Sequence, residues 1–181
     1  LATIGGNLVS ARPAADFPPP LMVYGAKAVL KSSTGERTVA VSDFIEGPGQ
    51  TIISPEEILD SFLLEKPQAH SGSAYIKLGI REALEISLVN VAVSVTTDGP
   101  GGPIKAARVV MGSVGPTPLM SPSAEKVLLG EKPSEALFFA AGQAAAMDSR
   151  PIDDFRASAE YKRAMVKELT RRALAQAYGK I

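Results

Sequence analysis

A valine-rich hairpin limits the folds open to this chain more than any other feature of its sequence. Residues 88–97 are rich in β-branched side chains, and residues 104–111 form a second run of the same kind. Between them lies Asp98-Gly99-Pro100-Gly101-Gly102-Pro103, a cluster that neither a helix nor a strand accommodates. The pattern therefore predicts two antiparallel strands joined by a tight connection, with residues 75–78 as a further strand of the same sheet.

The last third of the sequence is typical of helices. A Ser-Pro pair starts the first predicted helix at residue 121, and Gly130 ends it. Further helices are expected over 134–147 and 158–178, the last with Tyr161, Met165, Leu169 and Ala173 spaced along one apolar face. Together with the hairpin, these segments predict an α+β fold.

The first third is divided by glycine and proline into short segments. Runs at 28–31, 39–41 and 58–64 have the composition of strands, and Ser54-Pro55-Glu56-Glu57 predicts the start of a helical turn. Residues 65–72 have the composition of a linker. We therefore expect two domains, residues 1–68 and residues 72–181.

Composition excludes several classes of function. The 181 residues include no cysteine and one histidine, His70, so Cys-based metal, iron–sulfur and disulfide chemistry cannot belong to this chain. The 19 basic and 19 acidic residues cancel, which argues against a nucleic-acid partner. No stretch approaches the roughly 20 apolar residues of a membrane span. No metal site is predicted.

Three places could contact a ligand. Thr3, Ile4, Gly5, Gly6 and Asn7 could form a nest of backbone N–H groups for a pyrophosphate, although a Gly-Gly pair alone favours an ordinary turn.

Asp16 could bind sugar hydroxyls or cap a helix, and Lys77 could be either a solvent-facing strand lysine or a cation at a ligand. No catalytic acid, base or nucleophile stands out, so any chemistry would belong to a cofactor.

These residues, taken in order with others, resemble the FAD-binding (medium) subunits of molybdenum hydroxylases of the carbon monoxide dehydrogenase and xanthine dehydrogenase type. The matching positions run along the whole chain: 2–8, Pro13, 15–16, 20–21, 35–37, 43–44, 47–49, 55–59, 75–77, Arg81, Arg108, Gly112, 116–118, 124–125, Leu128, Gly130, Asp154, Arg156, 158–159 and 161–163.

The resemblance implies part of an FAD-binding domain of the vanillyl-alcohol-oxidase-like type. A C-terminal domain like that of carbon monoxide dehydrogenase flavoproteins follows it, with an antiparallel sheet and helices. It maps the second pyrophosphate loop onto Thr3, Ile4, Gly5, Gly6 and Asn7. Further FAD contacts map onto Asp16 and Leu59, and the lysine at the isoalloxazine ring maps onto Lys77. The family's N-terminal FAD subdomain, with its own glycine-rich loop, has no counterpart here, so we read the chain as a fragment and expect it to bind FAD weakly or not at all when alone.

The implied function is that of an oxidoreductase subunit in the cytoplasm. Electrons would pass from a molybdopterin-containing large subunit and a [2Fe–2S] small subunit through FAD to an acceptor such as NAD. Two alternatives stay open: a non-catalytic fragment that docks partner subunits, and an unrelated α+β binding module.

Overall fold

The computed structural model describes residues 2–81 and 85–181, and its larger part is built on one antiparallel sheet. The order is β6-β7-β8-β9, with β6 Ser71–Leu78, β7 Val89–Thr97, β8 Ile104–Gly112 and β9 Leu119–Met120. β7 and β8 are the valine-rich hairpin, paired from Asn90–Gly112 to Thr97–Ile104, so the predicted hairpin is confirmed.

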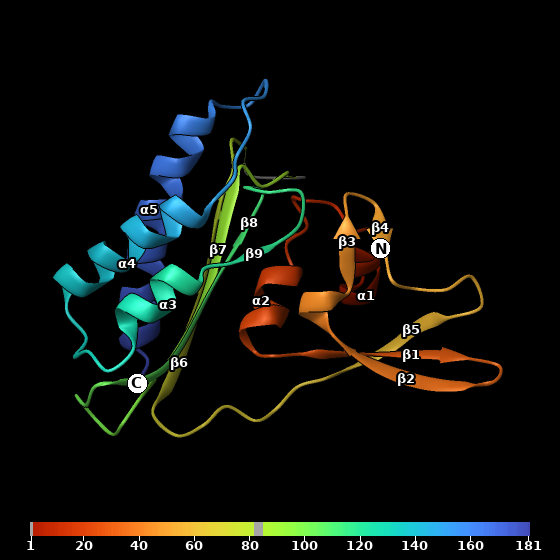
Figure 1. Cartoon of the computed structure of the whole chain (residues 1–181), viewed down its shortest axis with the longest axis horizontal. Coiled ribbons are helices and arrows are strands. Elements are labelled where there is room, and N and C mark those ends of the chain that lie inside the picture. The colour runs from red at the N-terminus through yellow and green to blue at the C-terminus, as the bar shows by residue number, and fades with distance from the viewer. Residues whose placement is uncertain (1, 82–84) are drawn as a thin grey trace.

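Three helices follow the sheet, and each begins at a serine whose hydroxyl accepts a hydrogen bond from a first-turn N–H group. They are α3 Pro122–Leu128, α4 Glu135–Asp148 and α5 Ala159–Tyr178, capped by Ser121, Ser134 and Ser158. α3 and α5 pack on one face of the sheet, and α4 packs against both of these helices (Figure 1). The three predicted helices and the α+β class are confirmed.

The smaller, N-terminal part consists of short elements. They are α1 Ile4–Val9, α2 Pro18–Val23, β1 Lys27–Ser32, β2 Gly35–Ala40, the 3-10 turn η1 Val41–Asp43, β3 Ile45–Gly47, β4 Gln50–Thr51 and β5 Ile58–Leu63. The strands form an antiparallel sheet of order β2-β1-β5 and a separate β3-β4 pair. The three predicted strands exist, with β2 ending one residue earlier than expected because Val41 begins η1.

The local sequence patterns led to wrong expectations about the structure in four places. Gly5 and Gly6 lie inside α1 and not in a turn, because Thr3 caps a helix at this point. Residues 54–57 form a single turn that runs directly into β5, not the start of a helix. The three prolines of α2 occupy its first turn, where no N–H donor is needed, so they begin a helix. Tyr161 is 46% exposed, because the buried face of α5 runs through Lys162, Val166, Leu169 and Ala173 instead.

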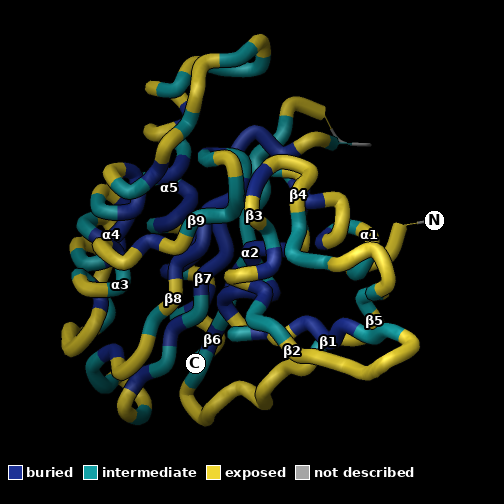
Figure 2. The backbone as a smooth tube through the Cα atoms, turned by 45° about the vertical axis from the view of Figure 1, so that its right-hand side comes forward, coloured by how far each residue is buried: buried dark blue, intermediate teal, exposed yellow. Residues whose placement is uncertain are grey.

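The two faces of the large sheet bury different partners. The side chains of Val89, Val91, Val93 and Val95 join the core beneath the three C-terminal helices. On the opposite face, Ala92 and Val110 pack with Leu21, Met22 and Val23 of α2, which belongs to the N-terminal part. The buried sections of the tube in Figure 2 run through the sheet and both of its neighbours. Packing therefore joins the two predicted domains across the second face of the sheet.

The segment between Leu63 and Ser71 has no regular structure and is largely exposed. It is shorter than the expected linker because Ser71 and Gly72 already pair with Thr96 and Val95. The boundaries 1–68 and 72–181 stay predictions. Among the described helices, none is both long and apolar enough to cross a membrane.

Candidate functional site

The candidate site centres on an ion pair between the N-terminal part and the large sheet. Lys77, near the end of β6, donates from Nζ to Asp16 Oδ2 at 2.7 Å. Tyr75 lies two residues earlier on the same face of β6, and its hydroxyl donates to Asp16 Oδ1 at 3.2 Å. Burial, and then the neighbouring Asp16 carboxylate, raise the pKa of Tyr75, so the phenol keeps its proton and remains a donor. Lys77 is therefore not a free, solvent-facing strand lysine.

The position of Asp16 depends on a contact made by Asn7. The Asn7 side chain, in α1, accepts a hydrogen bond at its Oδ1 from the Phe17 backbone N–H at 3.0 Å. This contact ties the stretch that carries Asp16 to α1. Asn7 thus has a structural role beside any contact it makes to a ligand.

α1 offers unpaired backbone donors where the glycine motif was singled out. Thr3 Oγ1 accepts from the Gly6 N–H at 2.9 Å, and the Asn7 N–H bonds to the Thr3 carbonyl. The N–H groups of Ile4 and Gly5 have no acceptor among the described residues, as expected in a first helical turn. An anion can accept from both groups.

Leu59 of β5 borders the same helix. A Cβ added at Gly5 would lie 3.5 Å from Leu59 Cδ2, so the two positions are in van der Waals proximity, and only a hydrogen stands between the backbone and this leucine. The structure thus brings Leu59 beside Thr3, Ile4, Gly5, Gly6 and Asn7, and joins this group to Asp16 and Lys77 through Phe17.

Two carboxylates that hold this arrangement were not singled out in the sequence as site residues. Glu85 accepts from the N–H groups of Ile80 and Arg81 at 2.8 and 2.6 Å, and its backbone carbonyl accepts from Lys77 Nζ at 2.9 Å. The Glu85 contacts therefore fix the chain just after β6 and one of the Lys77 donors. No local pattern signals this, because Glu85 is one acidic residue among 19.

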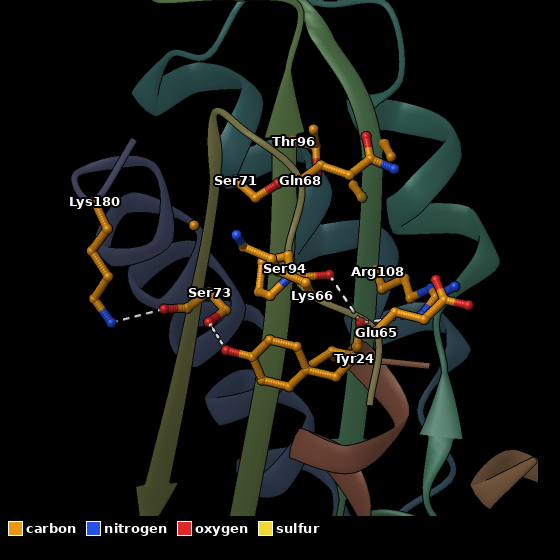
Figure 3. Close-up of a pocket in the computed structure, with 15 residues that line it drawn as sticks. Tyr24, Glu65, Lys66, Gln68, Ser71, Ser73, Ser94, Thr96, Arg108 and Lys180 are labelled. Atoms are coloured by element: carbon orange, nitrogen blue, oxygen red, sulfur yellow. Dashed lines mark hydrogen bonds between the residues drawn. The ribbon is translucent and has the colours of Figure 1, made fainter. Parts of the chain in front are cut away.

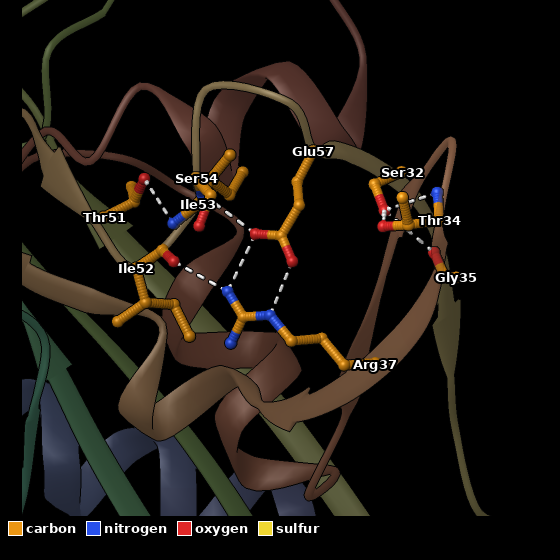
Figure 4. Close-up of polar contacts among 9 residues, drawn as sticks. All are labelled: Ser32, Thr34, Gly35, Arg37, Thr51, Ile52, Ile53, Ser54 and Glu57. Atoms are coloured by element: carbon orange, nitrogen blue, oxygen red, sulfur yellow. Dashed lines mark hydrogen bonds and ion pairs between the residues drawn. The ribbon is translucent and has the colours of Figure 1, made fainter.

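The second carboxylate, Glu57, forms a bidentate ion pair with Arg37 of β2 (Figure 4). Arg37 Nε and Nη2 lie 2.6 and 2.8 Å from its oxygens, and Nη2 also donates to the Ile52 carbonyl at 2.8 Å. Glu57 accepts the Ser54 N–H as well, which reproduces half of a capping box without a helix. The Arg37 guanidinium lowers the pKa of Glu57 to about 2. This pair holds the turn that leads into β5 and hence Leu59.

All eight residues singled out in the sequence thus belong to one connected surface, at the edge where the N-terminal part meets the end of β6. The surface offers backbone N–H groups, an apolar side chain and a paired cation and anion. Among the described residues, no group of three or more His, Asp and Glu side chains is placed to hold a metal ion.

Comparison with protein families gives two matches in tandem. Residues 74–177 match the family described as the CO dehydrogenase flavoprotein C-terminal domain. Residues 1–65 match the family described as the FAD binding domain in molybdopterin dehydrogenase.

Individual relatives extend this result over nearly the whole chain. The putative xanthine dehydrogenase FAD-binding subunit of Escherichia coli K12 is 29% identical over 178 residues, which is 98% of this chain and 60% of that protein. The carbon monoxide dehydrogenase medium chain of Afipia carboxidovorans is 32% identical over 177 residues, again 60% of its length.

A solved structure of carbon monoxide dehydrogenase from Hydrogenophaga pseudoflava superposes with a TM-score of 0.91 at 30% identity, over 99% of this chain and 61% of that one. The chain therefore spans about 60% of the length of these relatives.

Proposed function

Because this chain belongs to the family of CO dehydrogenase flavoproteins, FAD-binding subunits of molybdenum hydroxylases, we propose that it carries electrons between a partner's iron–sulfur clusters and an acceptor such as NAD through bound FAD. The observation that carries the proposal is the Asp16–Lys77 ion pair, which joins the two matched segments at the surface where all the predicted FAD contacts meet. A site shared by two segments suits an elongated cofactor.

The residues present fit an FAD molecule. The N–H groups of Ile4 and Gly5, which have no acceptor among the described residues, would donate to a phosphate. Asp16 would accept from a cofactor hydroxyl, and Leu59 would pack against an apolar part. Bound FAD supplies the redox chemistry, and these groups bind and orient it.

The partners in this proposal are a molybdopterin-containing large subunit and a [2Fe–2S] small subunit. The support is that the chain has no cysteine with which to hold a cluster of its own, while its relatives are named as medium chains and FAD-binding subunits. In this proposal the large subunit selects and oxidises the substrate. The cytoplasmic location is part of the same proposal.

The test of the FAD site introduces a negative charge in the first turn of α1. Gly5→Asp places a carboxylate in the first turn of α1, where acidic residues stabilise helices, yet it sets that charge against the pyrophosphate. We expect FAD to bind the purified chain weakly, with quenching of flavin fluorescence, and Gly5→Asp to lose this binding while keeping its melting temperature. Thr34→Asp in the turn after β1 adds the same charge elsewhere and serves as the control. Equal FAD affinity in the two variants would contradict the proposal.

A second candidate role, docking of a partner subunit without redox activity, is favoured by one exposed loop. Phe155 is 96% exposed although its loop is firmly held. The buried Lys162 ammonium bonds the Ile152 carbonyl at 2.9 Å and Asp154 at 2.8 Å, while Asp154 also pairs with Arg156 at 2.6 Å. A rigid loop that presents an aromatic ring to solvent is typical of an interface anchor.

We assign this loop to the iron–sulfur subunit, because it lies at the same end of the molecule as the end of β6 (Figure 1). Phe155→Ala should abolish co-purification with that subunit and leave FAD binding unchanged. Phe139→Ala, which removes another half-exposed ring, on α4, is the control. Unchanged co-purification of the Phe155 variant would exclude the loop as the anchor.

A further inference from the structure

The far end of the large sheet holds a pocket of about 360 Å³ that contains none of the eight predicted FAD contacts. Its walls come from the end of α2, the connection at residues 65–68, the strands β6 to β8 and Lys180 (Figure 3). Lys66, Gln68, Ser71, Ser73 and Lys180 fall outside both family-matched segments. About half of the lining therefore comes from residues outside the two family matches, and the rest, Arg108 included, lies within them.

Strand register explains why the floor of the pocket is polar. Ser71 faces Thr96, and Ser73 faces Ser94, which in turn faces Arg108 on β8. Alternation along the strands puts these five side chains on the sheet face opposite α3 and α5. Farther along, α2 covers the same face over Ala92 and Val110, but it ends at Val23, so the polar section stays open.

The hydroxyl groups of this floor retain hydrogen-bond donors for a ligand. Ser71 and Thr96 share one hydrogen bond of 2.9 Å, and Tyr24 and Ser73 share another of 2.6 Å. Each pair uses one of its two hydroxyl protons, so one O–H group per pair remains to donate. Ser94 donates to the Val23 carbonyl and keeps its acceptor capacity.

The charged groups add a surplus of cations. Arg108 Nη1 donates to the Val23 carbonyl at 3.2 Å, and no acceptor among the described residues takes its other N–H groups. Its guanidinium packs against Gly25, where a Cβ would lie 2.5 Å from Nη1, so the head group is held in place. Lys66 has no ion pair within the described chain, and the Lys180 ammonium donates there to one acceptor, the Ser73 carbonyl. Glu65 is the single acidic residue in the lining.

We propose that this pocket binds the phosphate group of a small phosphorylated molecule. Phosphate carries more than one negative charge and several acceptor oxygens, which matches a fixed arginine, two lysines and the spare hydroxyl protons. The volume lies at the lower end of small-molecule pockets, so there is room for a short carbon skeleton beside the phosphate. The ligand would touch α2, the connection and the sheet together, and so stabilise the junction between the two parts.

Calorimetric titration of the purified chain with glycerol 3-phosphate tests the proposal. We expect saturable binding that weakens as salt is added, and a loss of about tenfold or more in Arg108→Gln. Arg172→Gln, on the exposed side of α5 and away from the pocket lining, should bind as the unaltered chain does. Equal affinity in the Arg108 and Arg172 variants, or no saturable binding, would overturn the proposal.

Three further measurements separate this pocket from other sources of binding. Lys66→Gln removes an exposed cation that forms no ion pair with the described residues. This variant should weaken binding with no change in melting temperature, which covers the case that Arg108→Gln does not fold. Gly5→Asp should bind glycerol 3-phosphate normally, and its loss of binding would place the anion at α1 instead. Inorganic phosphate should bind more weakly than glycerol 3-phosphate. Equal affinity for the two would mean that the pocket recognises the phosphate alone and not a carbon skeleton.

Discussion

At the scale of single residues, the Asp16–Lys77 pair sets the charges that the proposed FAD site would present to a flavin. A cation near the part of the flavin that becomes negative on reduction raises the reduction potential, and a neighbouring carboxylate offsets that effect. Lys77 is 23% exposed and Asp16 39%, so solvent weakens but does not remove either charge. The pair, and not the lysine alone, is therefore the electrostatic unit.

We expect Lys77→Ala to lower the flavin potential of the assembled enzyme and Asp16→Asn to raise it, because the two charges act in opposite directions. Lys31→Ala removes a cation from a comparable surface pair with Asp60 and should leave the potential unchanged. Spectroelectrochemical titration of the three variants measures the effect. Potentials that move in the same direction in the Lys77 and Asp16 variants would contradict this account.

The Arg37–Glu57 pair predicts a pH dependence whose sign follows from its direction. Arg37 lowers the pKa of Glu57 from its ordinary 4.5 to about 2 in the folded chain, so the folded state holds the proton less tightly than the unfolded state. The contribution of the Arg37–Glu57 pair to the free energy of unfolding is therefore complete above about pH 4.5 and is lost as the pH falls toward 2.

The melting temperatures of the unaltered chain and Glu57→Gln should therefore differ at neutral pH and converge in acid. The difference will be small, because exposed ion pairs contribute little. Glu56→Gln, the exposed neighbour without an ion pair among the described residues, should show no such convergence. A constant difference across this pH range would mean that the pair is not formed in solution.

At the scale of elements, the approach of α4 to α5 depends on Gly142. A Cβ at this position would lie 2.4 Å from the Lys167 carbonyl oxygen, so any side chain forces the two helices apart. Because this contact is with backbone, no rotamer change can relieve it. The apolar composition of α4 does not reveal which of its small residues carries this contact.

Gly142→Ala should destabilise the chain by about 1–3 kcal/mol, the usual cost of overpacking, despite the better helix propensity of alanine. Gly179→Ala is the matched control, since its Cβ would lie 3.4 Å from the Ala175 carbonyl at an ordinary backbone φ of −62°. Denaturant unfolding of both variants measures the difference. Equal stability of the two variants would show that α4 and α5 can separate at no cost.

At the scale of the whole molecule, the connection at residues 64–70 joins the two parts through an exposed stretch. It has no regular structure and is largely exposed, while the flanking strands β5 and β6 are paired in different sheets. The two parts nevertheless share the core around Ala92, Val110 and α2, and the Asp16–Lys77 pair.

Limited proteolysis should therefore cut within residues 64–70 and leave two pieces that still elute together on gel filtration. Asp16→Asn together with Lys77→Ala should weaken that association. Mass spectrometry of the products locates the cut. Cleavage scattered through residues 88–111 would contradict the two predicted parts.

Patterns confined to neighbouring residues were enough to predict most of the elements. The Gly-Pro cluster at 98–103 predicts the hairpin, and Ser121-Pro122 predicts the start of a helix, because turn geometry and capping are satisfied within a few residues. At residues 54–57 the pattern failed because a distant residue intervened. Glu57 would suit a capping box, but Arg37, 20 residues away, binds its carboxylate beside a strand.

The resemblance likewise identified the eight candidate contacts from the sequence, but their arrangement is a tertiary property. Asp16 and Lys77 are 61 residues apart and meet only because α2 packs on the second face of the sheet. The pocket around Arg108 could not be predicted from the sequence for the same reason. Its hydroxyl groups come from different strands, and only the pairing of those strands brings them together. Sequence by itself determined the β7–β8 hairpin and the three C-terminal helices, because hydrogen bonds within a helix or hairpin are local, and it also carried the family resemblance. Only the tertiary structure decided which side chains share a face, because burial of apolar surface between distant segments sets that choice.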